Sequence, residues 1–323
     1  KAAETVSARL KDSCIAEIDR DGSFAAIGGT WRALAKLHQI MTKYPLHMVQ
    51  HYVVPAEEMI AFCADIVAAD APKGYGGAEH VSSSRRELVP FGAAVLGEVL
   101  KAGRFKDVVF SALGVREGFL YGMLDPREQA IDPLIQGAEE LSVLRSRSPA
   151  HANDLIAFSG QFLAVTGQDE SSDEARLRTV ACLLSDIGWR EHPDYRARQT
   201  MLQVLRLPFM AIDHPSRAAL AWALYTRYGG KADNPDAETV IGMMSNRALK
   251  RGEVVGRALR LAHRLSGSSP ALLSKTRLSL ADNILDLHMP ADEIYCPEER
   301  LAGPLKSLAS AAGYTPGRIL RHG

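Results

Sequence analysis

Apolar and polar positions follow two different patterns along this chain, and the change falls near residue 127. Before it, short β-rich runs at 23–29 and 107–112 are each followed by a glycine-containing turn and a pattern with helical spacing. Strand, turn and helix in this order predict an α/β region over roughly the first 125 residues. The functional end of such a sheet is usually the turn where a strand gives way to a helix.

Helices are predicted around these strands. The N-terminal stretch 1–19 places four apolar side chains on one helical face, at Val6, Leu10, Cys14 and Ile18. Further helical patterns cover 30–41, 56–70 and 89–103. The intervening segment 71–87 is polar and rich in glycine and serine, which predicts a loop.

The second part of the chain is almost wholly helical by pattern, from 130 to 265, with few β-branched runs. Residues 277–290 alternate with a period closer to two, which predicts a small hairpin, and 301–314 predict a closing helix. We therefore predict two domains, 1–127 and 128–323.

Composition narrows the class of protein. Of 323 residues, 46% are apolar and 24% charged, which is typical of a folded globular chain. The 38 Lys and Arg balance the 38 Asp and Glu, so net charge does not indicate a polyanionic partner and local charge must be examined. The four cysteines are scattered without a CxxC pair, which argues against a zinc ribbon and favours a reducing, cytoplasmic compartment. No apolar run is long enough to predict a membrane span.

The turn after the first predicted strand is the first candidate site. It carries Gly28, Gly29 and Thr30 directly before a helix. Such a turn exposes backbone N–H groups, and the helix N-terminus adds a positive partial charge that suits a phosphate. Thr30 can cap the helix or donate its hydroxyl to a phosphate oxygen. The glycines can equally serve close packing of strand and helix, and the pattern alone is consistent with both interpretations.

Two further junctions carry arginine. Arg85 and Arg86 precede the helix at 89–103, and the planar guanidinium suits phosphate, although a solvated surface pair is the alternative. Arg116 and Glu117 follow the second predicted strand. They can form a structural ion pair, or Glu117 can place Arg116 over an anionic ligand.

Three stretches together resemble a known family. AIGGTWRALAKLH, SRRELVPFGAAVL and SALGVREGFLYGML occur in the order and spacing of the exopolyphosphatase and guanosine pentaphosphate phosphohydrolase family, whose fold is actin-like and related to ribonuclease H. The resemblance implies a second actin-like lobe in 1–127, and hydrolysis of phosphoanhydride bonds in a cleft between two lobes. It also implies Mg²⁺ as a cofactor and a homodimer.

The resemblance assigns roles to individual residues. Gly28, Gly29 and Thr30 match the family's turn near the bound phosphate or nucleotide, and Arg86 matches a position that binds phosphate or guanosine tetraphosphate. Arg116 and Glu117 match the family's REG signature, whose role is partly structural. The sequence has no DxGGGS-type phosphate loop. We therefore expect the chain to begin within the second lobe, with no catalytic residue of its own and with the Mg²⁺ ligands outside this segment.

The helical part resembles the HD-type domain that is often appended in this family. Ser185 and Asp186 stand where the HD pair is expected, and His263 stands where a ligand aspartate is expected. Other candidate metal ligands are His151, His192 and His214. With two expected ligands replaced, we predict a helical scaffold that holds no metal. The alternative is a metal-dependent phosphohydrolase.

A basic run lies between 247 and 277. It holds eight Lys or Arg against a single acid, Glu253. Arg257, Arg260 and Arg264 share one side of a predicted helix, which is either a solvated face or a path for a long polyphosphate chain. No aromatic side chains interleave with these positions, which argues against nucleic acid as the partner.

The sequence thus predicts the C-terminal part of an exopolyphosphatase. Its substrate is inorganic polyphosphate, guanosine pentaphosphate or both. The alternative function is a non-catalytic module that binds polyphosphate or guanosine tetraphosphate.

Overall fold

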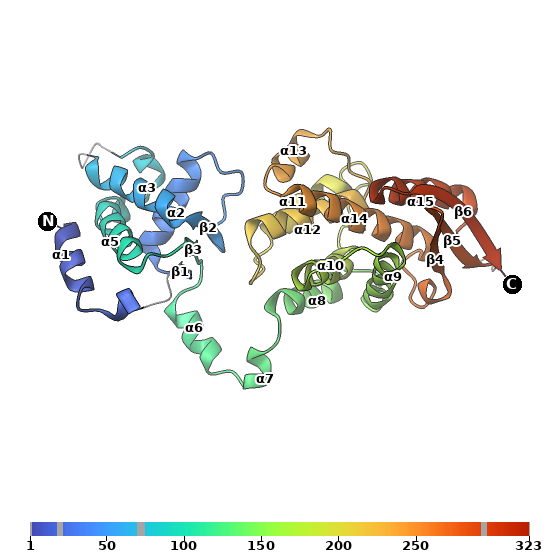
Figure 1. The fold of residues 1–323 in the computed structure, drawn as a ribbon, viewed down its shortest axis with the longest axis horizontal. Coiled ribbons are helices and arrows are strands. Elements are labelled where there is room, and N and C mark those ends of the chain that lie inside the picture. The colour runs from blue at the N-terminus through green and yellow to red at the C-terminus, as the bar shows by residue number, and fades with distance from the viewer. Residues whose placement is uncertain (1, 18–21, 70–74, 292–295, 323) are drawn as a thin grey trace. The chain divides into compact units, whose positions relative to one another are not determined.

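The computed structural model describes residues 2–17, 22–69, 75–291 and 296–322 (Figure 1). The chain separates into two compact units, 1–131 and 132–323. This division lies a few residues beyond the boundary expected at 127, and each unit has its own sheet. The protein is mostly helical, with two small three-stranded sheets.

The first unit is built on the strands β1 (Ser23–Ala26), β2 (Tyr52–Pro55) and β3 (Asp107–Phe110), in the order β1-β3-β2. β1 and β3 run parallel, and β2 pairs with β3 in the antiparallel direction. The strands β1 and β3 are confirmed. The sequence analysis missed β2, because it ends in proline and leads directly into a helix, without the glycine-containing turn that follows β1 and β3.

Three long helices accompany this sheet: α2 (Gly29–Met41), α3 (Ala56–Ala68) and α5 (Val89–Gly103). All three were predicted, and together with the strands they bury one apolar core that includes Leu34, Met59 and Phe110. Proline in the first turn of α5 replaces an N–H that would have no helical partner.

The N-terminal helix is shorter than expected. α1 spans Ala2–Leu10 and is followed by a 3₁₀ turn, Cys14–Glu17, so the prediction of one helix over 1–19 was wrong. Ser13 explains the end, because its hydroxyl and its backbone N–H both donate to the carbonyl of Leu10, at 2.6 and 3.1 Å. Ile18 lies outside the described residues.

Short helical turns fill the rest of the first unit. The 3₁₀ turn Ala78–His80 and α4 (Ser83–Arg86) lie in the segment predicted as a loop. α6 (Val115–Gly122) and α7 (Pro126–Gln129) follow β3.

The second unit begins with seven helices, as the sequence predicted for 130–265. They are α8 (Pro133–Arg145), α9 (His151–Thr166), α10 (Ser172–Leu184), α11 (Arg196–Arg206), α12 (His214–Arg227), α13 (Pro235–Ile241) and α14 (Asn246–Ser266). α14 packs closely on α12 through two glycines one turn apart. A Cβ on Gly252 would lie 3.1 Å from the carbonyl oxygen of Ala219, and one on Gly256 would overlap the carbonyl oxygen of Ala223.

The unit ends in a small sheet. β4 (Arg277–Ala281) and β5 (Ile284–Pro290) form the predicted hairpin. The predicted closing helix is α15 (Glu298–Ala312), and it leads to β6 (Thr315–His322), which pairs in parallel with β5. β6 was missed because proline and glycine at its start read as loop. Within the described residues, no helix has the length and apolar character needed to cross a membrane.

Candidate functional site

The first candidate site is the turn between β1 and α2. Gly28 precedes the helix with φ 116° and ψ 160°, a backbone conformation that is essentially restricted to glycine. Its carbonyl accepts the backbone N–H of Arg32 at 3.0 Å, which is the first bond of the helix. Gly28 is therefore required by the turn itself.

Gly29 has a different role. A Cβ at this position would lie 3.3 Å from a terminal guanidinium nitrogen of Arg85, which reaches the helix N-terminus from α4. The absence of a side chain on Gly29 thus allows a cation to sit against the first turn of α2. A ligand that lies there would meet that cation and the helix N-terminus together.

A hollow of about 360 Å³ opens beside this contact. Its basic side chains come from three elements: Arg32 and Lys36 from α2, His80 from the 3₁₀ turn and Arg85 from α4. The rest of the lining is Ala33, Leu37, Val81 and Ser82, so no carboxylate is among the described residues that line it. Outside the lining, Glu79 Oε1 lies 3.5 Å from Nε2 of His80. The hollow is suited to an anion.

Arg32 is held in a fixed position at this site. Its Nε donates to the carbonyl of Gly28 at 3.3 Å, and one terminal nitrogen donates to the carbonyl of Ala112 at 2.8 Å. Gly28 follows β1 and Ala112 follows β3, and the carboxyl ends of parallel strands meet at one edge of a sheet. Arg32 therefore ties together the two turns that the sequence singled out.

Arg86 does not share this hollow. Its guanidinium donates to the carbonyl of Val81 at 3.3 Å, and its own carbonyl accepts the hydroxyl of Tyr75 at 3.1 Å. Of the two adjacent arginines, Arg85 lines the hollow and Arg86 holds the loop.

Thr30 packs against another helix. A Cβ on Gly92 of α5 would overlap the methyl group of Thr30, and the indole N–H of Trp31 donates to the carbonyl of Gly92 at 3.1 Å. The threonine methyl thus fills the gap that Gly92 leaves between α2 and α5.

Arg116 and Glu117 lie on the exposed first turn of α6. Glu117 Oε2 accepts the backbone N–H of Gly114 at 2.7 Å and so caps the helix. That hydrogen bond lowers the pKa of the Glu117 carboxyl, with further contributions from its own backbone N–H and from the charges of Arg116 and Arg32. The structural role of Glu117 is that of a helix cap.

The sequence analysis missed Arg32, Lys36 and His80. The four-residue spacing of Arg32 and Lys36 directly after the glycine turn was a usable signal, because it puts both cations on one side of α2. His80 had no such signal, because a 3₁₀ turn within a polar loop leaves no recognisable period.

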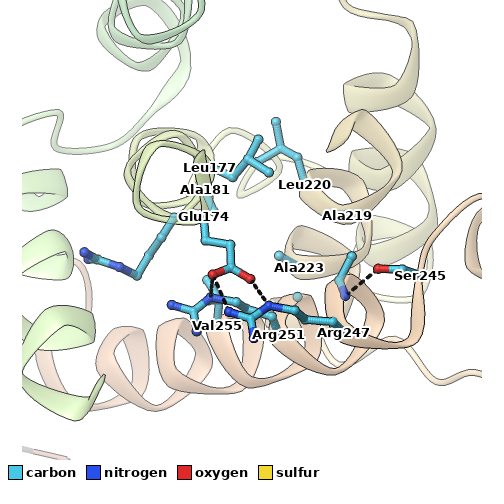
Figure 2. A pocket seen from close by; sticks show the side chains of 13 residues that line it. Glu174, Leu177, Ala181, Ala219, Leu220, Ala223, Ser245, Arg247, Arg251 and Val255 are labelled. Atoms are coloured by element: carbon cyan, nitrogen blue, oxygen red, sulfur yellow. Dashed lines mark hydrogen bonds and ion pairs between the residues drawn. The ribbon is translucent and has the colours of Figure 1, made fainter. Parts of the chain in front are cut away.

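In the second unit, some arginines of the basic run are paired with acids and others line a cavity. Figure 2 shows Arg247 and Arg251 reaching Glu174 at the mouth of a pocket of about 130 Å³ whose other walls are mainly apolar. Nε of Arg247 lies 2.7 Å from one Glu174 oxygen, and a terminal nitrogen of Arg251 lies 2.6 Å from Glu170. Arg257 pairs with Glu253 on its own helix at 3.3 Å. These three charges are neutralised by acids, two of which come from outside the run.

Arg260 and Arg264 are placed differently. They line a second hollow, of about 470 Å³, together with four further arginines: Arg147, Arg196, Arg227 and Arg300. No Asp or Glu is among the described residues that line it. The polyanion path stays a prediction, and its three arginines have different surroundings. Arg257 is engaged by Glu253, whereas Arg260 and Arg264 face a basic cavity.

The positions that resemble an HD centre do gather in space. His263 Nε2 lies 2.9 Å from the Ser185 hydroxyl, and the His263 and His151 rings are 5.1 Å apart. Asp186 is paired with Arg147, at 2.9 and 2.6 Å. A guanidinium thus contacts the carboxylate that a metal would need, and no group of three His, Cys, Asp or Glu in the described part of the chain is placed to hold a metal ion.

The two other candidate histidines lie elsewhere. His192 is exposed, with Nδ1 3.7 Å from Asp194, and His214 is buried at the start of α12.

Each of the two units matches the model of a known protein family. Residues 3–127 match the model described as the Ppx/GppA phosphatase family, and residues 134–318 match the model described as exopolyphosphatase, C-terminal. The second match alone covers more than half of the chain. The chain belongs to the Ppx/GppA phosphatase family. A search of curated proteins finds no match to it.

Membership in the Ppx/GppA family confirms the resemblance drawn from the three sequence stretches. It is consistent with a mostly helical α/β protein that carries two small sheets. It also supports a phosphatase function that acts on phosphoanhydrides in general.

Proposed function

We propose that the protein serves to hydrolyse the terminal phosphoanhydride bond of inorganic polyphosphate, of guanosine pentaphosphate, or of both. The observation that carries this proposal is the cationic hollow at the start of α2, with Arg32, Lys36, His80 and Arg85 around it. A phosphatase of this family needs a place for several adjacent negative charges, and the hollow offers one.

The residues that line this hollow would bind and orient the substrate. Arg85 presents a planar guanidinium next to the first turn of α2, so a phosphate there would receive charge-assisted hydrogen bonds and the field of the helix N-terminus. Arg32, fixed by two carbonyls, would keep the second cation in position without reorganisation. These groups would stabilise the charge that spreads over phosphate oxygens during transfer.

The resemblance also leads us to propose Mg²⁺, an actin-like first unit and an HD-like second unit. The lining of the hollow does not suit Mg²⁺, which prefers carboxylate and other oxygen ligands, because its charged groups are cations. We therefore derive no catalytic step through the metal. We propose that its ligands, like the acid that activates water, lie outside these residues.

A homodimer and a cytoplasmic location are proposed on the same resemblance and on the scattered cysteines. Light scattering of the purified chain would give the mass of the assembly. A monomer at micromolar concentration would contradict the dimer.

One observation favours the second candidate function, a non-catalytic module that binds polyphosphate or guanosine tetraphosphate. Both basic hollows lack a carboxylate among their described lining residues, so neither offers an acidic side chain as the general base. Phosphate release distinguishes the two functions. Binding of polyphosphate without release, in the presence of Mg²⁺, would favour the binding module for this chain.

The proposed role of the first hollow is tested by replacing one arginine at a time. We expect Arg85→Gln to weaken binding of polyphosphate or guanosine tetraphosphate about tenfold, because one charge-assisted contact is lost. Arg86→Gln is expected to change it less than twofold, since Arg86 faces the loop. Arg127→Gln, on exposed α7, is the control. Loss of binding in Arg86→Gln but not in Arg85→Gln would return the role to Arg86 and contradict the proposal.

A further inference from the structure

The hollow in the second unit is strongly basic. Its six arginines come from separate parts of the chain: Arg260 and Arg264 from α14, Arg227 from the end of α12, Arg196 from the start of α11, Arg300 from α15 and Arg147 from the segment before α9. Like charges gathered around one space repel each other unless an anion joins them.

Arg227 forms the inner wall of this hollow. Its side chain is only 11% exposed and lies over the ring of Tyr228, with 4.1 Å between the guanidinium carbon and the ring centroid. Its Nε is buried, and within the described residues it has no hydrogen-bond partner. A buried guanidinium without its full set of partners is costly.

Within the described part of the chain, Asp186 contacts two of these six arginines and carries one negative charge. Both of its oxygens accept hydrogen bonds from Arg147, and one lies 3.7 Å from Arg227. Burial lowers the pKa of Arg260, and the neighbouring positive charges of Arg264 and Arg257 lower it further.

His263 also lines this hollow, and it adds neither a negative charge nor a ring nitrogen that is free to bind a metal. His263 is held by the Ser185 hydroxyl at 2.9 Å and by the Ser268 hydroxyl at 2.8 Å. Burial and the charge of Arg227 lower its pKa well below its ordinary value, so the ring is neutral. A neutral hydrogen-bonded wall behind a ring of guanidinium groups suits an anion and disfavours a cation.

We propose that this hollow is a discrete binding site for a short run of linked phosphates, two or three groups long, held by Arg227, Arg260 and Arg264 with Arg196 and Arg300 at its rim. A cavity of about 470 Å³ is larger than a single phosphate requires. This inference deepens the proposed function, because it assigns residues 132–323 a site of their own for the same ligand class.

The test is a calorimetric titration of the chain with inorganic tripolyphosphate. It uses an Arg85→Gln background, so that the first hollow contributes little. We expect one site per chain to remain, with an affinity that falls as salt is added. Arg264→Gln should weaken it about tenfold, and Arg257→Gln, on the same helix but paired with Glu253, less than twofold. Arg264 is exposed, so its replacement does not threaten folding.

Two outcomes would overturn the inference. One is no saturable binding in the Arg85→Gln background. The other is equal weakening by Arg257→Gln and Arg264→Gln, which would indicate a diffuse basic surface. Thermal unfolding of each variant checks that the second unit is intact.

Further titrants define the ligand. GTP carries the same triphosphate on a nucleoside, and equal affinity for GTP and tripolyphosphate would support a site that recognises linked phosphates. The inference would be overturned if GTP bound and tripolyphosphate did not. It would also be overturned if orthophosphate bound as tightly as tripolyphosphate. A failure of phosphate release with this binding intact would reject the proposed hydrolysis and leave this site standing.

Discussion

Gly28 and Gly29 are neighbours in the sequence, yet the structure needs them for different reasons. Gly28 takes a backbone conformation that other residues avoid, and a Cβ there would meet nothing within 4 Å. Gly29 has an ordinary conformation, but its missing Cβ makes room for Arg85. Close packing of strand and helix therefore does not explain Gly28, and ligand binding at Gly29 stays a prediction.

This distinction predicts different consequences of the same substitution. Gly28→Ala should destabilise the first unit by about 2 kcal/mol through backbone strain alone. Gly29→Ala should change stability by less than about 1 kcal/mol, since alanine favours the helix, but should weaken polyphosphate binding by displacing Arg85. Denaturant unfolding and a binding titration measure the two effects. Equal stability of Gly28→Ala and the parent chain would contradict the assignment.

Glu174 gives a prediction about pH. Hydrogen bonds from Arg247 and from the backbone N–H of Ser171, and the charge of Arg251, lower the pKa of its carboxyl to about 2. A carboxyl whose pKa is lower in the folded state than in the unfolded one stabilises the fold above its ordinary pKa, and that contribution is lost as pH falls toward the folded value. Glu174→Gln should therefore cost on the order of 2 kcal/mol at pH 7, discounted for the exposure of Arg247.

The difference in unfolding free energy between the parent chain and Glu174→Gln should shrink as pH is lowered from about 4.5 toward about 2, where the parent carboxyl also becomes neutral. Unfolding by urea at a series of pH values measures it. A difference that does not depend on pH across this range would mean that the lost interaction is not ionic.

At the scale of elements, the contact between α12 and α14 depends on small residues. Gly256→Ala would bring a Cβ into the carbonyl oxygen of Ala223 and the hydroxyl of Thr226, so the helices would have to separate. We expect a loss of about 2–3 kcal/mol. Gly118→Ala in α6, where a Cβ meets nothing within 4 Å, should instead stabilise by up to about 1 kcal/mol. Thermal unfolding distinguishes them, and equal midpoints would show that the α12–α14 contact can relax.

Helices with a clear apolar period were predictable from the sequence, and so were the two strands that run into a glycine-containing turn. α2, α5 and the helices of the second unit belong to the first group, and β1 and β3 to the second. β2 ends in proline and leads directly into α3, and β6 begins with proline and glycine, so neither strand gave a usable signal.

The candidate site was predictable only in part, for a related reason. The glycine turn is a local signal. The choice between Arg85 and Arg86 depends on the carbonyl of Val81 and the hydroxyl of Tyr75, which only the folded loop brings near. The pairing of Arg247 with Glu174 likewise joins residues far apart in the sequence, so counting charges within the run overestimated its free positive charge.

At the scale of the whole molecule, the segment between β3 and α8 carries several exposed apolar side chains. Val115, Phe119 and Met123 are each about 70% exposed. We expect trypsin to cut first after Arg116 or Arg127, both exposed, and to release two large fragments. Mass spectrometry of a time course identifies the cuts. A segment 110–131 that stays intact while the helices of the second unit are digested would contradict this expectation.

The parallel pairing of β5 with β6 has a consequence for how the chain reaches its native state. β5 can pair with β4 at once as a hairpin, but its other edge must wait until α15 has formed and carried β6 back to it. A nascent or refolding chain therefore passes through a stage in which a β-strand edge containing Leu285 and Leu287 is open to neighbouring molecules. Yield during synthesis and refolding would then depend on chain concentration, even if the finished protein is soluble and stable.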